Sequence, residues 1–157
     1  MPTPSERRLK DKKIGEIINP RLIQSPPDIS VDRAIELMRE NNSAYLVVAE
    51  AKRVVGIFTE SDVARKILNT KVDTRRPVRD FMTADPLVLR QDDPVGRAVD
   101  LMADNDVYHI PLVNEKQELV NVLSVRTLVR FLAEFYPGEV YNIPPNPHQV
   151  AHTAEGG

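Results

Sequence analysis

One short segment combines residue types that could hold a phosphorylated ligand. Residues 56–62 read Gly-Ile-Phe-Thr-Glu-Ser-Asp, so an apolar strand ends at the hydroxyl of Thr59 and the carboxylate of Asp62 follows three residues later. The residues that follow, as far as Leu68, have the apolar spacing of a helix. The N–H groups of a helix N-terminus can bind a phosphate, and a carboxylate one turn further can accept both hydroxyls of a ribose. One hypothesis is therefore a ligand site where the strand becomes a helix.

The same spacing has a purely structural interpretation. In a capping box the Thr hydroxyl accepts a hydrogen bond from the backbone N–H three residues later, and the acidic side chain there bonds back. Taken alone, Thr59 and Asp62 favour this capping box, because acidic residues are common at that position where helices begin. An internal repeat shifts the balance toward a ligand site.

The chain contains two copies of one unit, because the segment 31–41 recurs at 95–105. The identical pairs are Val31 and Val95, Arg33 and Arg97, Ala34 and Ala98, Leu37 and Leu101, Met38 and Met102, and Asn41 and Asn105. The similarity continues from 44–48 to 108–112 and from 55–59 to 120–124.

Each copy is predicted to hold the elements helix-strand-helix-strand-strand-helix. The patterns indicate helical turns at 14–19 and 78–83, extended pieces at 22–25 and 87–89, helices from about 30 to 42 and 93 to 105, first-copy strands at 45–49 and 54–58, and a last helix at 125–135. Because a unit of about 60 residues is small for its own core, the two copies are expected to pack together. The predicted fold class is α/β (α+β), with two pseudo-symmetric repeats packed through their sheets.

Composition divides the chain into five segments. They are a basic N-terminal segment (1–13), repeat 1 (14–70), a polar linker (71–77), repeat 2 (78–136), and a Pro-rich C-terminal arm and tail (137–157). The arm is expected to be extended, with Tyr141 and Ile143 available to dock on the body, and the residues from about His148 onward are expected to be disordered.

The composition excludes several classes of function. The 157 residues carry a formal net charge of −2, which gives no basic field for nonspecific binding to nucleic acid or to an anionic membrane. The absence of cysteine excludes disulfides, thiolate zinc sites and a cysteine nucleophile. No signal-peptide core and no apolar run of about 18 residues are found, so we expect a soluble cytoplasmic protein.

The sequence contains no catalytic signature. A nucleophile elbow, a Walker-type Gly-rich loop, an HExxH motif and kinase motifs are all missing. We therefore expect no catalytic residues and no required cofactor. His148 and His152 have a metal-like spacing, but they lie in a Pro-flanked segment without acidic or Cys partners nearby, so no metal site is predicted.

The repeat and its motifs resemble a tandem pair of cystathionine β-synthase (CBS) domains, the arrangement called a Bateman module. The resemblance covers about residues 14–135 and rests on the element order, on the Gly-apolar-apolar-Thr-x-x-Asp ending of the first copy, and on His-Ile-Pro-Leu-Val-Asn at 109–114. It implies pseudo-twofold packing with two clefts that bind AMP, ADP, ATP, S-adenosylmethionine or related adenosyl compounds. It also implies a regulatory sensor, and the alternatives are a structural association module without a ligand and, least favoured, an enzyme.

The resemblance assigns one cleft a complete set of ligand contacts. The residues carried over are Thr59, Asp62, Leu87, Val88, Leu89, Tyr108, His109, Ile110 and Pro111. Asp62 would hold the ribose, the three apolar residues from 87 to 89 would line the adenine, and Tyr108 and His109 would stand where relatives place basic groups on the phosphate. A merely hydrogen-bonded His109 stays an open alternative, because imidazole carries a charge only near or below a pKa of about 6.5.

The second cleft departs from the family pattern on both walls. Ser124 keeps the hydroxyl, but Thr127 replaces the aspartate and cannot bind two ribose hydroxyls as a carboxylate does. Across from it, Tyr45 stands where the family has a basic residue. We expect this cleft to be empty or differently used.

The last helix predicts association between chains. Its apolar stripe, to which Leu132 and Phe135 contribute, cannot be covered wholly by the other copy, and exposed apolar stripes favour symmetric association. We therefore expect a homodimer, which the C-terminal arm could extend, and an unidentified effector protein as a further partner.

Overall fold

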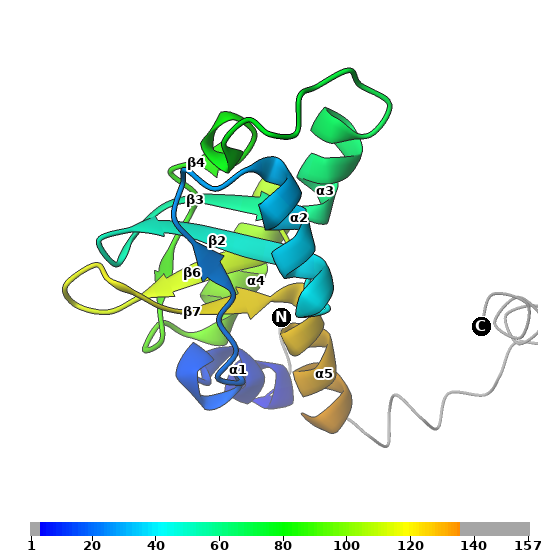
Figure 1. Ribbon diagram of the computed structural model, residues 1–157. Helices are drawn as coiled ribbons and strands as arrows, with labels where there is room; N and C mark the ends of the chain where they lie inside the picture. The colour runs from blue at the N-terminus through cyan, green and yellow to red at the C-terminus, as the bar shows by residue number, and fades with distance from the viewer. Residues whose placement is uncertain (1–3, 136–157) are drawn as a thin grey trace, which may run out of the picture.

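The computed structural model of the protein describes residues 4–135 (Figure 1). The first half holds α1 (Pro4–Asp11), η1 (Ile14–Glu16), β1 (Gln24–Ser25), α2 (Val31–Glu40), β2 (Tyr45–Glu50), β3 (Arg53–Thr59), α3 (Glu60–Asp62) and the π-helical η2 (Val63–Ile67). The second half holds η3 (Val78–Asp80), β4 (Thr83–Ala84), β5 (Leu89–Arg90), α4 (Val95–Asn105), β6 (His109–Val113), β7 (Leu119–Ser124) and α5 (Val125–Phe135). The predicted α/β fold with two repeats is confirmed.

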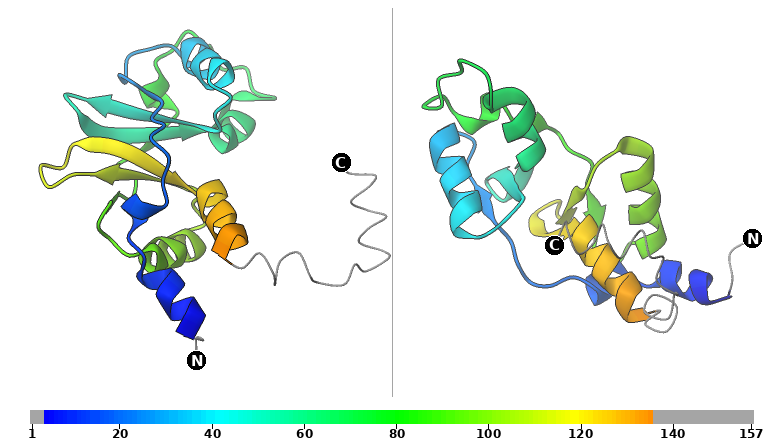
Figure 2. Two further views of the ribbon diagram at one scale, coloured as in Figure 1. Left: turned by 90° about the horizontal axis from the view of Figure 1, so that it is seen from below. Right: turned by 90° about the vertical axis from the view of Figure 1, so that its right-hand side faces the viewer.

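The strands form two sheets with equivalent pairing. One has the order β1-β2-β3-β4 and the other the order β5-β6-β7. In each, a short strand runs parallel to the first strand of an antiparallel hairpin. The two hairpins lie one above the other in Figure 2, with α2 and α4 on the outer sides. Because both hairpins are almost wholly apolar, each sheet buries one face against the other repeat and one against its own helix. The repeats thus pack through their sheets, as predicted.

The helical turn that opens each copy packs on the other copy's half. Ile14 of η1 is fully buried in the core around β6, and its N–H donates to the carbonyl of Asp93 at 3.0 Å. Val78 of η3 is fully buried in the core around β2, and its N–H donates to the carbonyl of Ile29 at 2.7 Å. This exchange ties the two halves together, and it places the segment after η3 beside the end of β3.

The N-terminal segment contains a helix that its charged composition did not indicate. α1 lies against α4, with Leu9 buried between them. A Cβ added to Gly96 would lie 3.0 Å from Cβ of Lys10, so the missing side chain lets the two helices approach closely.

None of the helices within 4–135 is long and apolar enough to cross a membrane. The predictions for the C-terminal arm and tail, which include docking of Tyr141 and Ile143, disorder from His148 and no metal at His148 and His152, fall outside the described residues.

Candidate functional site

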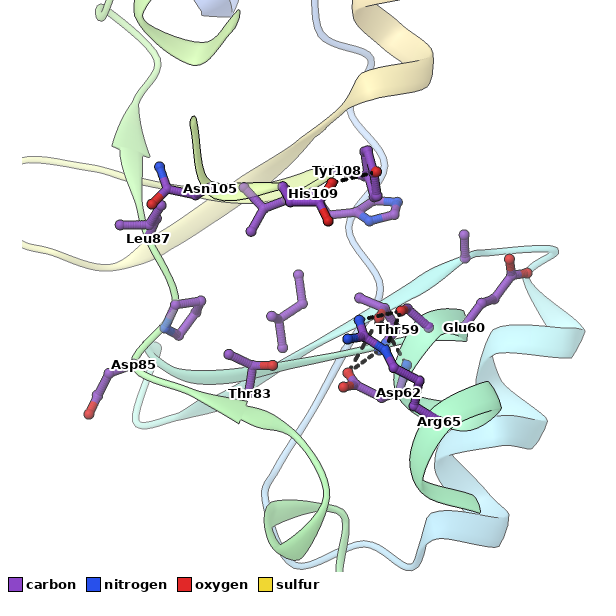
Figure 3. Close-up of a pocket in the computed structure, with 16 residues that line it drawn as sticks. Thr59, Glu60, Asp62, Arg65, Thr83, Asp85, Leu87, Asn105, Tyr108 and His109 are labelled. Atoms are coloured by element: carbon purple, nitrogen blue, oxygen red, sulfur yellow. Dashed lines mark hydrogen bonds between the residues drawn. The ribbon is translucent and has the colours of Figure 1, made fainter. Parts of the chain in front are cut away.

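A cleft of about 740 Å³ opens between the two halves, where β3 ends and β6 begins. Figure 3 shows Thr59, Asp62 and Arg65 on one wall, with Tyr108 and His109 facing them from the other. The loop after β4 closes one side with Pro86 and Leu87. This volume lies within the range of about 300–1,000 Å³ that is typical of small-molecule sites.

The start of α3 forms a capping box. The N–H of Thr59 donates to Oδ2 of Asp62 at 2.9 Å, and the N–H of Asp62 donates to Oγ1 of Thr59 at 3.4 Å. The Thr59 hydroxyl also lies 3.3 Å from the same carboxylate oxygen and donates to it. The structural interpretation of this spacing is therefore confirmed, and the ligand hypothesis has to be compatible with it.

Lys66 holds the other oxygen of the Asp62 carboxylate. Its Nζ lies 3.0 Å from Oδ1 of Asp62 and donates to the carbonyl of Phe81 at 2.7 Å, while the Asp62 side chain is only 8% exposed. A carboxylate offers about four acceptor sites, and the two Thr59 donors and Lys66 occupy three of them. Two ribose hydroxyls could bind only if the Thr59 hydroxyl turned away or Lys66 moved.

Arg65 brings a permanent positive charge to the cleft, and it was missed in the sequence. It follows Asp62 by three residues, in the π-helical η2 that continues α3, and its Nε and one Nη donate to Oγ of Ser61 at 3.1 and 2.6 Å. The signal that could have found it is this i+3 spacing, which places both side chains on one helix face.

Tyr108 and His109 form the facing wall. Tyr108 is 53% exposed, and its hydroxyl donates to Oδ1 of Asp106 at 2.7 Å, which raises the pKa of the phenol. The imidazole of His109 lies against the ring of Tyr45, with 5.3 Å between the centroids. Burial lowers the pKa of His109 below its ordinary value of 6.5, so at neutral pH it can donate a hydrogen bond but brings no charge.

The remaining predicted residues are divided between the cleft and the core. Leu87 lines the cleft, whereas the exposed Val88 lies outside its lining. Leu89 and Ile110 are buried in the core of the second half, and the fully buried Pro111 pairs with Val122 of β7, so none of the three lines the cleft. Ile110 and Pro111 are neighbours on β6, so they point to opposite faces of the sheet, and both faces are buried. The ligand-binding roles of the nine residues stay predictions.

Several lining residues were not identified from the sequence. Besides Arg65, they include Glu60, Thr83, Asp85, Asn105 and Asp106. Most belong to loops or helix ends that reach the cleft only through the packing of the two halves.

The second predicted site has a different local structure. Ser124 accepts a hydrogen bond from the N–H of Thr127 at 3.2 Å, so the cap of the following helix is kept without a carboxylate. Phe131 stands where the first repeat has Lys66, so both members of the Asp62–Lys66 pair are replaced. Tyr45 is buried and its hydroxyl donates to the carbonyl of Arg21 at 3.0 Å. Burial raises the pKa of this phenol, which therefore stays neutral.

No group of three or more His, Cys, Asp or Glu side chains suited to a metal ion occurs within residues 4–135.

The profile of the CBS domain family matches two tandem segments of the chain, 14–69 and 78–134. The chain belongs to the CBS domain family. It is 31% identical over 125 residues to an uncharacterized 17.7 kDa protein of Acidianus ambivalens, covering 79% of this chain and 75% of that protein. It is 30% identical over 120 residues to inosine-5′-monophosphate dehydrogenase of Methanocaldococcus jannaschii, covering 76% of this chain but 23% of the enzyme.

Several solved structures share the fold. An uncharacterized conserved protein of Pyrococcus horikoshii has a TM-score of 0.71 at 27% identity, over 77% of this chain and 92% of that one. A CBS domain protein of Pyrobaculum aerophilum complexed with AMP has a TM-score of 0.71 at 24% identity. The match covers 80% of this chain and 99% of that one. The CBS domain pair of protein MJ0100, in complex with 5′-methylthioadenosine and S-adenosylmethionine, has a TM-score of 0.70 at 20% identity, over 77% and 99%.

Proposed function

We propose that this CBS pair is a regulatory module that binds an adenine nucleotide or a related adenosyl ligand in the cleft between its repeats. The observation that carries the proposal is the meeting of Thr59 and Asp62 with Tyr108 and His109 across that cleft. The ligands named for two CBS structures of the same fold, AMP and the pair 5′-methylthioadenosine and S-adenosylmethionine, support an adenosyl compound. The match to only 23% of a dehydrogenase supports regulation and not catalysis.

Titration calorimetry of the full chain against AMP, ADP, ATP and S-adenosylmethionine tests this proposal. We expect saturable binding of at least one of the four, and a rise in Tm with the same ligand, because a ligand that binds only the folded state stabilises it. GMP serves as the control for the base. If none of the four adenosyl compounds bound, the proposal would be wrong.

One observation favours a structural association module without a ligand. Both oxygens of the Asp62 carboxylate already have partners within the first repeat, from Thr59 and Lys66. On this alternative the spacing serves only to begin α3, and adenosyl compounds leave both the calorimetric trace and the Tm unchanged.

We also propose that the module acts as a homodimer, alone or with an effector protein. α5 exposes Val125, Val129 and Leu132 along one face, and Val129 is 60% exposed. The side chain of Phe135 falls outside the described part of the structure. Light scattering at micromolar concentration should give the mass of a dimer for the native chain and of a monomer for Val129→Glu. Glu134→Lys, on the opposite face of α5, is the control that should stay dimeric.

A further inference from the structure

The charges around the cleft differ from those of a phosphate site. Four carboxylates line it, from Glu60, Asp62, Asp85 and Asp106, and Arg65 is the basic side chain of the lining. Lys66 compensates Asp62, so three carboxylates remain against one guanidinium. His109 also lines the cleft but adds no compensation at neutral pH, because burial lowers the pKa of its imidazole below 6.5.

These carboxylates surround the cleft and do not cluster on one side. Glu60 begins α3 on the first wall, and Asp106 caps the end of α4 on the second. Asp85 lies at the rim after β4, and Figure 3 shows its side chain pointing away from the cavity. All three residues are exposed, so solvent and salt screen their charges in part. Within a Debye length of about 10 Å such charges still act on a ligand inside.

A negative cleft discriminates among the adenosyl compounds. A phosphate ester carries a charge of about −1.5 to −2 at pH 7, so AMP and ATP are repelled by every unpaired carboxylate. 5′-Methylthioadenosine presents the same adenosine without a charge. S-Adenosylmethionine has a sulfonium and an ammonium against a single carboxylate, and is therefore attracted.

We propose that this cleft selects adenosyl compounds whose 5′ substituent is uncharged or cationic, in preference to adenine nucleotides. The proposal rests on the proposed function, since it assumes that the cleft binds an adenosyl ligand. The amino-acid end of a sulfonium ligand would find Glu60 and Asp106 for its ammonium group and Arg65 for its carboxylate. These three residues determine specificity, whereas Thr59 and Asp62 would contact the part that all these ligands share.

Calorimetry of the full chain with 5′-methylthioadenosine, S-adenosylmethionine, AMP and ATP, in EDTA and at low ionic strength, tests the selectivity. We expect the first two compounds to bind at least about tenfold more tightly than the nucleotides, because several like charges act together. Added salt should weaken the binding of S-adenosylmethionine and strengthen the binding of AMP. AMP or ATP binding as tightly as 5′-methylthioadenosine would overturn the selectivity and leave the proposed function standing. Failure of all four to bind would overturn both.

A pair of substitutions locates the effect. Glu60→Gln with Asp106→Asn keeps size and hydrogen bonding, and Asn tolerates the left-handed backbone of residue 106 (φ 52°). The affinity ratio of AMP to 5′-methylthioadenosine should rise about threefold for each charge removed. Glu50→Gln, exposed at the end of β2 that lies away from the cleft, is the control and should leave the ratio unchanged. An equal ratio in the double variant and the native chain would refute the proposal.

Discussion

Asp62 has a structural role in the fold, and the proposed function gives it a second role as a ligand contact. Its carboxylate accepts from the Thr59 N–H and pairs with Lys66 before any ligand arrives. Asp62→Ala should lower the free energy of unfolding by about 0.5–2 kcal/mol, the usual cost of losing a helix cap. It should also weaken the binding of the adenosyl ligand by about 1.5–3 kcal/mol, the scale of hydrogen bonds to a charged group. Urea denaturation and calorimetry on the same variant measure the two effects.

Ser124→Ala is the matched control for Asp62→Ala. It removes the hydroxyl that caps α5 in the second repeat, so it should cost a similar free energy of unfolding while leaving ligand affinity unchanged. A loss of stability in both variants with no loss of affinity in either would leave Asp62 only its capping role.

Burial of His109 makes the free energy of unfolding fall as the pH falls. Its pKa is lowered in the folded state, so between that value and about 6.5 the unfolded chain binds more protons. The stabilisation is therefore complete above pH 6.5 and is lost as the pH falls through the folded pKa. Unfolding free energies measured from about pH 7.5 to about pH 5 should decline more steeply for the native chain than for His109→Gln. Identical slopes would mean that the imidazole titrates as it does in the unfolded chain.

At the scale of elements, Gly56 of β3 leaves room for the side chain of Met82, which comes just before the paired strand β4. A Cβ at this position would lie 2.2 Å from Sδ and 2.8 Å from Cγ of Met82. Gly56→Ala should therefore lower the free energy of unfolding by about 1–3 kcal/mol, the range for overpacking a core. In a double-mutant cycle Met82→Ala should recover part of this loss, because it removes the clashing atoms. If the losses of unfolding free energy from Gly56→Ala and Met82→Ala simply added, the contact between residues 56 and 82 would not be the cause of the destabilisation.

The elements could be predicted because their signals are local. The apolar strands 45–49 and 54–58, the helices after them and the duplicated segment all follow from spacing within a few residues of each other. α1 was not predicted, because charged residues surround its buried apolar side chain, Leu9, and mask the spacing of apolar residues that indicates a helix. Thr59 and Asp62 were found for the same reason, since they lie within one motif.

At the scale of the whole molecule, the rest of the site could not be predicted because it depends on contacts distant in sequence. η1 and η3 pack on opposite halves from their own repeats, and this exchange brings the loop at Asp85 and Leu87 beside α3. Asp106 reaches the same cleft from the end of α4. A linear repeat specifies two equal units, whereas the packed pair places unequal side chains on the two sides.

That inequality predicts the number of ligands. The first repeat supplies Asp62 with Lys66, whereas the second has Thr127 with Phe131, and the buried Tyr45 hydroxyl is already bonded to the carbonyl of Arg21. We therefore expect one adenosyl ligand per chain. Asp62→Ala should lower the affinity for this ligand, and Thr127→Ala should leave it unchanged. Thr127→Asp alone should add at most weak binding, because the new carboxylate would repel a phosphate and the opposite wall has the neutral Tyr45 in place of a cation. Two equivalent sites by calorimetry, or a crystallographic ligand beside Thr127 and none beside Asp62, would contradict this assignment.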